Sequence, residues 1–163
     1  MIRKTVRALC AASVALAPLV LCATPAHAVS SCTVNGIPAS GPVISGTPGS
    51  DFIRCAYVGA GDTVNGLGGN DRIVVTGPMA GTVDGGLGSD YISTDDGVSG
   101  TIIGGDGSDF IVVNGTVAST GVVNGAAGND YLRTGFNNGV VDGGTGFDSC
   151  RVSGGNAPIH CEA

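Results

Sequence analysis

The sequence is poor in the residues that fill an ordinary globular core and cover a charged surface. It has no tryptophan, 4% aromatic residues and 12% charged residues over 163 positions. Its one lysine is Lys4, so almost all positive charge comes from arginine. A nucleic-acid-binding protein needs a basic stripe, whereas this chain has thirteen acidic against seven basic residues. The composition therefore argues against nucleic acid as a partner and favours cations.

The N-terminus has to be set aside before the fold is considered. Residues 1–28 combine a basic start, an apolar stretch and the ending Ala26-His27-Ala28, the pattern of a secretory signal peptide cleaved before Val29. The apolar stretch is short and interrupted by Pro18, so we expect no membrane span. The processed chain would carry four arginines and thirteen acidic residues, a net charge of −9. We expect a secreted, extracellular protein.

Glycine is abundant, with 30 copies. Such a frequency is typical of disorder, fibres or repeats, and the β-branched residues between the glycines argue against disorder. Aligned on its glycines, the chain contains six copies of one nonapeptide at a period of 18 to 21 residues. Glycine holds the first and fourth positions and aspartate the sixth in every copy: GTPGSDFIR from Gly46, GLGGNDRIV from Gly66, GGLGSDYIS from Gly85, GGDGSDFIV from Gly104, GAAGNDYLR from Gly125 and GGTGFDSCR from Gly143.

Apolar residues form two columns, one on each side of the glycine turns. One column precedes the turn, and the other occupies its eighth position: Ile44, Val64, Val83, Ile102, Val123 and Val141, then Ile53, Ile73, Ile92, Ile111, Leu132 and Cys150. The step from the first column to the second is always nine residues, whereas the return step varies from 9 to 12. Each period therefore contains two strands and two turns. Only the glycine–aspartate turn has a fixed length, as expected of a loop that holds a ligand.

These columns predict an all-β fold. We expect a right-handed parallel β-roll (β-solenoid) of about six coils over residues 44–152, because each coil alone buries too little and its neighbours supply the core. Residues 29–43 and 153–163 are the expected N-terminal and C-terminal cap segments.

Stacking of the coils would align the sixth-position aspartates along one edge: Asp51, Asp71, Asp90, Asp109, Asp130 and Asp148. Adjacent strands lie ~4.8 Å apart, and two carboxylates at roughly that spacing repel by ~1 kcal/mol even in water. A Ca²⁺ ion between successive turns would reverse the sign, since calcium binds carboxylate and carbonyl oxygens with tolerant geometry. The glycines would let the turn direct its carbonyls inward. The pattern therefore predicts calcium.

The six nonapeptides resemble the GGxGxDxUx repeats of RTX calcium-binding proteins, whose fold is a parallel β-roll. In that family each ion lies between two turns, held by both sixth-position aspartates and by main-chain carbonyls near the first four positions. The resemblance implies five sites between consecutive aspartates, from Asp51 with Asp71 to Asp130 with Asp148. The implied turn glycines are Gly66, Gly69, Gly85, Gly86, Gly88, Gly104, Gly105, Gly107, Gly125 and Gly128.

Some features depart from that family. The second edge lacks the motif, so we expect ions on one edge only and expect Asp62, Asp95 and Asp96 there to be solvated. Pro48 and Phe147 interrupt the motif in the first and last turns, which puts the two end sites in doubt. RTX exoproteins usually carry a C-terminal export signal and some carry a toxin or hydrolase domain. With an N-terminal signal and no second domain in this sequence, we expect neither activity here.

Four cysteines follow the signal peptide: Cys32, Cys55, Cys150 and Cys161. An even number in an exported chain indicates disulfides, and three pairings are possible. Cys55 and Cys150 fall on interior positions of the first and last coils, and the other two lie in the flanks. We therefore expect Cys32–Cys55 and Cys150–Cys161, each holding a flank over an exposed strand edge.

No set of side chains has the spacing of a catalytic site. His160 is the one histidine of the processed chain and is expected to be an exposed tail residue. We expect a protein without enzymatic activity, whose calcium binding is coupled to folding.

Positions seven and nine of the repeats place aromatic residues and all four processed-chain arginines on one outward face: Phe52, Arg72, Tyr91, Phe110, Tyr131 and Ser149, with Arg54, Val74, Ser93, Val112, Arg133 and Arg151. Such a face is either a cross-strand ladder that stiffens the sheet or a docking surface for a glycan or anionic cell-surface polymer. The second interpretation makes the protein an adhesion or matrix module. The opposite face carries a short column of Thr63, Thr82 and Thr101, few for an ice-binding array.

Overall fold

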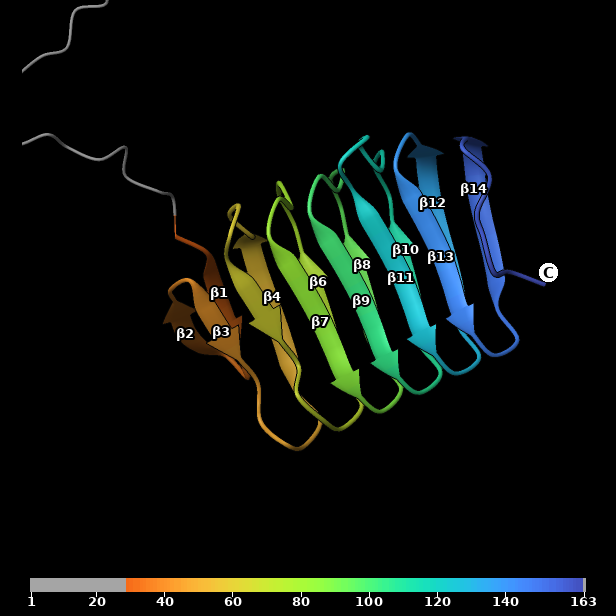
Figure 1. Ribbon diagram of the computed structural model, residues 1–163. Helices are drawn as coiled ribbons and strands as arrows, with labels where there is room; N and C mark the ends of the chain where they lie inside the picture. Colours follow the sequence, from red (N-terminus) through yellow and green to blue (C-terminus); the bar gives the residue numbers. More distant parts are fainter. Residues whose placement is uncertain (1–28, 163) are drawn as a thin grey trace, which may run out of the picture.

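The computed structural model describes residues 29–162, so the signal peptide expected at residues 1–28 lies outside the described residues. Residues 29–162 form β-strands and no helices, and the strands are arranged as two facing sheets (Figure 1). No helix in this part of the chain is long and apolar enough to cross a membrane.

Twelve strands build six coils, each coil giving one strand to each sheet. The six-stranded sheet contains β3 (Val43–Ser45), β5 (Thr63–Asn65), β7 (Thr82–Leu87), β9 (Thr101–Asp106), β11 (Val122–Ala127) and β13 (Val140–Thr145). The eight-stranded sheet contains β4 (Phe52–Tyr57), β6 (Arg72–Val75), β8 (Tyr91–Thr94), β10 (Phe110–Val113), β12 (Tyr131–Asn137) and β14 (Ser149–Gly155), extended by β1 (Ser31–Val34) and β2 (Ile37–Ser40). Strands of successive coils pair in parallel. The predicted all-β solenoid of about six coils is confirmed.

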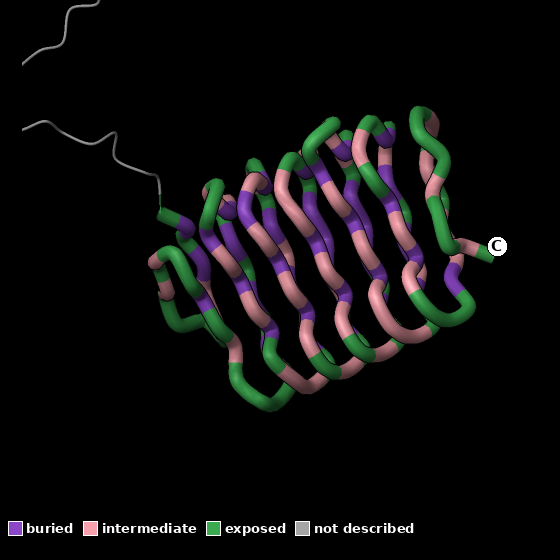
Figure 2. The backbone as a smooth tube through the Cα atoms, in the orientation of Figure 1, coloured by how far each residue is buried: buried purple, intermediate pink, exposed green. Residues whose placement is uncertain are grey.

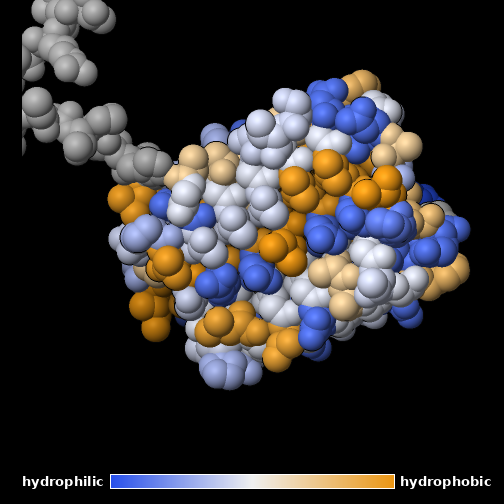
Figure 3. All heavy atoms as spheres, in the orientation of Figure 1, coloured by the Kyte–Doolittle hydropathy of each residue, from blue (hydrophilic) through white to orange (hydrophobic). Residues whose placement is uncertain are grey.

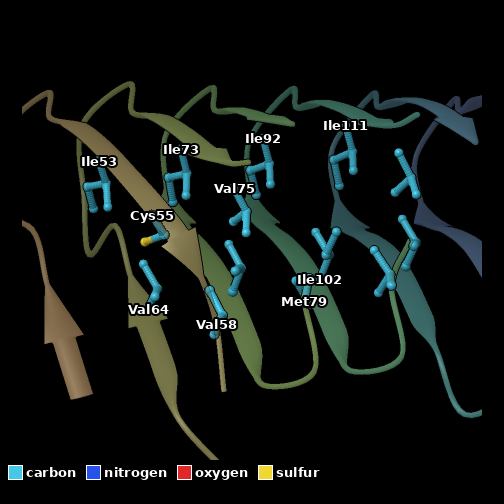
Figure 4. Packing of buried hydrophobic residues seen from close by; sticks show 14 of the residues in the cluster. Ile53, Cys55, Val58, Val64, Ile73, Val75, Met79, Ile92, Ile102 and Ile111 are labelled. Atoms are coloured by element: carbon cyan, nitrogen blue, oxygen red, sulfur yellow. The ribbon is translucent and has the colours of Figure 1, made fainter. Parts of the chain in front are cut away.

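Buried and more exposed residues alternate along these strands (Figure 2). The two predicted apolar columns face each other across the interior, and the members Ile53, Ile73, Ile92 and Ile111 lie in one row (Figure 4). All four have no exposed surface. Cys150, in the last coil, is only partly buried because no further coil covers it.

A third buried column lies in the second turn of the coils and escaped the sequence analysis. Isolated parallel bridges join its members in order: Val58, Met79, Val98, Val117 and Asn137. Each is at most 1% exposed. The step from a member to the buried residue of the next strand is four in some coils and six in others, so an alignment with a fixed period does not bring the members into one column. The variable return step has its source here.

The N-terminal cap is a hairpin of β1 and β2 that covers the edge of β4. β1 pairs antiparallel with β4, and Cys32 lies opposite Cys55, to which it is disulfide-bonded as predicted. The expectation that Asp62 is solvated is wrong. Asp62 is 4% exposed, because its Oδ2 accepts hydrogen bonds from the main-chain N–H (2.8 Å) and the hydroxyl (2.7 Å) of Ser30. Asp95 and Asp96 are exposed, as predicted.

The C-terminal tail lies along β13, at the opposite end from the hairpin (Figure 1). Ile159 donates to the Val141 carbonyl at 3.0 Å, and its own carbonyl accepts from the N–H of Gly143 at 2.9 Å. The predicted disulfide Cys150–Cys161 holds the tail to the last coil. Each end of the solenoid thus has one strand edge covered by a flank, the edge of β4 or that of β13, and each flank is fixed by a disulfide.

Candidate metal centre

The six glycine–aspartate turns all lie along one edge, the lower edge in Figure 1, where each strand of the six-stranded sheet leads into the other sheet. Every sixth-position aspartate turns inward and is at most 4% exposed. The main-chain N–H of each of the first five aspartates donates to Oδ1 of the aspartate in the next coil: 2.8 Å from Asp51 to Asp71, 2.7 Å from Asp71 to Asp90, and 2.8 Å for the steps to Asp109, Asp130 and Asp148. The aspartates form one continuous ladder, as the repeat predicted.

The second carboxylate oxygen of the ladder has no hydrogen-bond partner in five of the six aspartates. These atoms are Oδ2 of Asp71, Asp90, Asp109, Asp130 and Asp148, and all five are buried. An unpartnered buried acceptor is costly, and a native structure seldom leaves one without a reason. Five such atoms lie at equivalent positions in successive coils, which makes the ladder a candidate site for a cation.

The first-position glycines leave the space that these oxygens occupy. A Cβ atom built on Gly85 would come within 3.0 Å of Oδ2 of Asp90 and of the carbonyl oxygen of Gly104 in the next coil. Gly66, Gly104 and Gly125 repeat this arrangement in their own coils. Main-chain angles do not explain these first-position glycines, because none has a positive φ. Because these glycines have no side chain, a carboxylate oxygen of one coil and a carbonyl oxygen of the next coil can both lie close to the same point.

The fourth-position glycines have a different role. Gly107 has a φ of 140°, and a Cβ there would come within 3.0 Å of the carbonyl of Gly88 in the preceding coil. The other predicted glycines of the second and fourth positions likewise have φ between 101° and 136°: Gly69, Gly86, Gly88, Gly105 and Gly128. The first turn is the exception, since neither Thr47 nor Gly49 adopts a positive φ.

The environment of the ladder favours uncharged carboxyl groups in the absence of a bound cation. Burial raises the pKa of Asp109 to about 7 and that of Asp90 to about 6, from 3.8. The hydrogen bond from the preceding coil's N–H lowers both pKa values, and neighbouring carboxylates raise them further. Burial also raises the pKa of Asp71 and Asp130. A divalent cation would offset this desolvation.

The fifth-position residues form a second ladder that the sequence analysis did not identify. The N–H of Asn70 donates to Oγ of Ser50, that of Ser89 to Oδ1 of Asn70, and that of Phe147 to Oδ1 of Asn129. Each of these side chains accepts a hydrogen bond from the main chain of the next coil. Phe147 has no following coil of the repeat, so it needs no acceptor, which explains its departure from serine and asparagine.

The atoms of the ladder that could bind a metal ion are all oxygens, from carboxylates and main-chain carbonyls. Hard oxygen donors of this kind suit Ca²⁺, which accepts six to eight of them in flexible geometry. Among residues 29–162 no three His, Cys, Asp or Glu side chains converge into a metal-binding cluster. Any ion at the ladder would therefore rely on pairs of carboxylates and on carbonyls, and the buried unpartnered oxygens fit that requirement.

The other predicted residues lie away from the ladder. His160 is exposed, as expected, and its Nδ1 lies 2.8 Å from Oδ1 of Asp142. On the outward face of the eight-stranded sheet the rings of Tyr91, Phe110 and Tyr131 stack at centroid distances of 5.5 and 4.7 Å, both with planes 9° apart. The guanidinium of Arg72 lies 4.5 Å from the Tyr91 ring centroid. Because these rings stack on one another, their faces are already in contact within the sheet. This arrangement favours a cross-strand ladder that stiffens the sheet.

The six-stranded sheet faces the viewer in Figure 3, where hydrophobic and hydrophilic residues are interspersed. Its threonine column is in register, with Thr63 beside Thr82 and Thr82 beside Thr101. The column continues with Val122 and Val140. Three threonines within a mixed surface do not extend into a uniform array.

Comparison with family models, curated proteins and solved structures gives no match for this chain. The likeness to RTX repeats therefore rests on the six motifs alone.

Proposed function

We propose that this protein is a secreted, non-enzymatic calcium-binding β-roll in which Ca²⁺ ions bind between successive turns of the aspartate ladder. Each ion would neutralise a carboxylate that the fold buries, and a site exists only when two turns are stacked. Calcium binding is then coupled to folding. The two disulfides favour the oxidising environment of an exported protein.

The observation that carries this proposal is the row of buried Oδ2 atoms without a hydrogen-bond partner. From Asp71 to Asp130 each of these atoms has the first-position carbonyl of the next coil beside it. The donor set is carboxylate and carbonyl oxygen, which Ca²⁺ prefers and binds in flexible geometry.

Asp109→Asn tests the proposal at the centre of the row. The asparagine oxygen can still accept the N–H of Asp90, now at 2.8 Å from Oδ1, so the ladder hydrogen bond is retained and the charge is lost. Because Asp109 borders two of the proposed sites, we expect the rise in Tm that calcium produces to fall by at least about half, following the dependence of stability on ligand binding. The measurement is a thermal melt in calcium-stripped buffer and in millimolar calcium.

Asp95→Asn is the matched control, since it makes the same change at an exposed aspartate outside the ladder. We expect it to leave the calcium-induced rise in Tm unchanged. Equal responses of the two variants would count against a calcium site at the ladder.

A second candidate function is an extracellular adhesion or matrix module that binds an anionic glycan or polymer. It is favoured by the outward face of the eight-stranded sheet, whose strands contain all four arginines of residues 29–162 and no Asp or Glu. Arg133 and Arg151 are paired neighbours and both are exposed. The test is binding to a carboxylated or sulfated polysaccharide at physiological salt. Arg133→Gln with Arg151→Gln should weaken it several-fold, and unchanged binding would reject this candidate.

A further inference from the structure

The two ends of the aspartate ladder are built differently, and the difference changes where the row of ion sites begins and ends. Each inner coil has a carboxylate Oδ2 without a partner, next to a carbonyl of the following coil. A coil that lacks either of these groups lacks the donor set. The first coil and the C-terminal tail therefore decide the extent of the row.

The first coil has already satisfied its carboxylate. Oδ2 of Asp51 accepts the N–H of Thr47 at 2.6 Å and the Thr47 hydroxyl at 3.0 Å, while Oδ1 accepts from Nδ2 of Asn35 at 2.5 Å. Both carboxylate oxygens of Asp51 therefore have hydrogen-bond partners within the protein, and the first coil needs no ion to satisfy them. The first turn also lacks the positive φ angles that the other turns have at their second and fourth positions.

The last coil has an unsatisfied carboxylate and a substitute for the missing next turn. Asp148 has no exposed surface, and its Oδ2 has no hydrogen-bond partner. Its N–H donates to Oε2 of Glu162 at 2.6 Å, the bond that in every inner coil goes to the next aspartate. The Glu162 N–H in turn donates to the Asp148 carbonyl at 2.8 Å, as the residue after the next aspartate does in the inner coils.

The tail also provides the carbonyl oxygen. A Cβ on Gly143 would come within 3.0 Å of both Oδ2 of Asp148 and the main-chain oxygen of His160. In the inner coils that second oxygen belongs to the first-position glycine of the next turn. The backbone of the tail thus reproduces the next turn without carrying its sequence motif, and the disulfide Cys150–Cys161 keeps it in place.

We propose, on the basis of the function proposed above, that the calcium row is displaced by one coil relative to the motif. It begins at the pair Asp71–Asp90 and ends at a site formed by Asp148, Glu162 and the His160 carbonyl. The pair Asp51–Asp71 forms no site. The row then holds five ions, one for each unpartnered Oδ2 atom.

The test counts calcium ions per chain by equilibrium dialysis and elemental analysis, with intact mass confirming both disulfides. We expect five ions for the native protein, four for Glu162→Gln and five for Asp51→Asn. The amide oxygen of the Glu162→Gln variant would still accept the Asp148 N–H, and the disulfide would hold the tail. Loss of one ion would therefore not reflect release of the tail.

Two results would overturn the displaced row: an unchanged count for Glu162→Gln, or loss of an ion from Asp51→Asn. A native protein that binds no calcium would overturn the proposed function itself. A native protein that binds calcium with neither variant behaving as expected would overturn only the displacement.

Discussion

At the residue scale, the ladder consists of acids that the fold keeps away from water. Asp90 and Asp109 are at most 3% exposed, and burial is the main cause of their raised pKa values. A pKa raised by one corresponds to about 1.4 kcal/mol of preference for the protonated form. The calcium-free fold therefore prefers protons at these positions, and the calcium-bound fold would prefer ionised carboxylates.

This preference predicts opposite effects of pH with and without calcium. In calcium-stripped buffer the folded pKa values of about 6 and 7 exceed the ordinary value of 3.8. The folded state then binds more protons than the unfolded state between about pH 4 and 7, so stability falls as the pH rises through this window. We expect Tm to fall by at least about 5 °C from pH 4.5 to 7.5. In millimolar calcium it should rise over the same range, because the ion binds only ionised carboxylates.

The lowered pKa of Asp51 acts in the other direction, and its contribution is lost only as the pH falls below its ordinary value. It therefore does not affect the window above pH 4. Thermal melts at the two pH values in the two buffers check the prediction, and slopes of the same sign in both buffers would contradict it.

At the scale of the element, each turn is defined by where glycine is required. Position four of an inner turn combines a positive φ with close contact to the coil before it, as at Gly107. Position four of the first turn has neither feature: Gly49 has no positive φ, and the nearest atom to a Cβ built there is 3.9 Å away. The same motif position therefore has two structural meanings.

Gly107→Ala should destabilise the fold by about 2–4 kcal/mol, since the new Cβ both strains the backbone and meets the Gly88 carbonyl. Gly49→Ala is the matched control and should change stability by less than about 1 kcal/mol. Urea unfolding of the two variants measures the difference. Equal losses would show that the turns are alike after all.

The repeat predicted the turns more completely than it predicted the second edge. The aspartate register and both disulfides could be read from spacing, because a nine-residue step fixes which residues stack. The buried column that contains Met79 could not be read from spacing, because some coils have two more residues between this column and the next strand. Nor could the burial of Asp62, which depends on Ser30, 32 residues earlier. The role of Glu162 was hidden because the tail copies the geometry of a turn without its sequence.

At the scale of the whole molecule, a stack of parallel strands has two ends that need covering. The hairpin covers β4 and the tail covers β13, and each is fixed by one disulfide. An uncovered strand edge can pair with another chain. Each cap therefore removes one strand edge from such pairing, while β14 and β3 remain terminal strands of their sheets.

Replacement of Cys150 and Cys161 by serine tests the C-terminal cap. The bond closes a loop with a sequence separation of 11 residues, for which chain entropy predicts a loss of about 3 kcal/mol. We also expect self-association once the tail leaves β13. Urea unfolding and sedimentation velocity measure the two effects, with the Cys32→Ser, Cys55→Ser protein as the control for loss of the other disulfide. A variant that stays monomeric at full stability would show that the tail does not need its disulfide.

The most direct measurement is calorimetric titration of Ca²⁺ into the purified, calcium-stripped protein at pH 7.5, with circular dichroism recorded at each point. Binding coupled to folding predicts saturable heat, release of protons from the aspartates and a gain of β-structure that chelator reverses. Magnesium, which demands smaller octahedral sites, should not reproduce the effect at the same concentration. A titration without heat, with an unchanged spectrum and an unchanged Tm, would contradict the account.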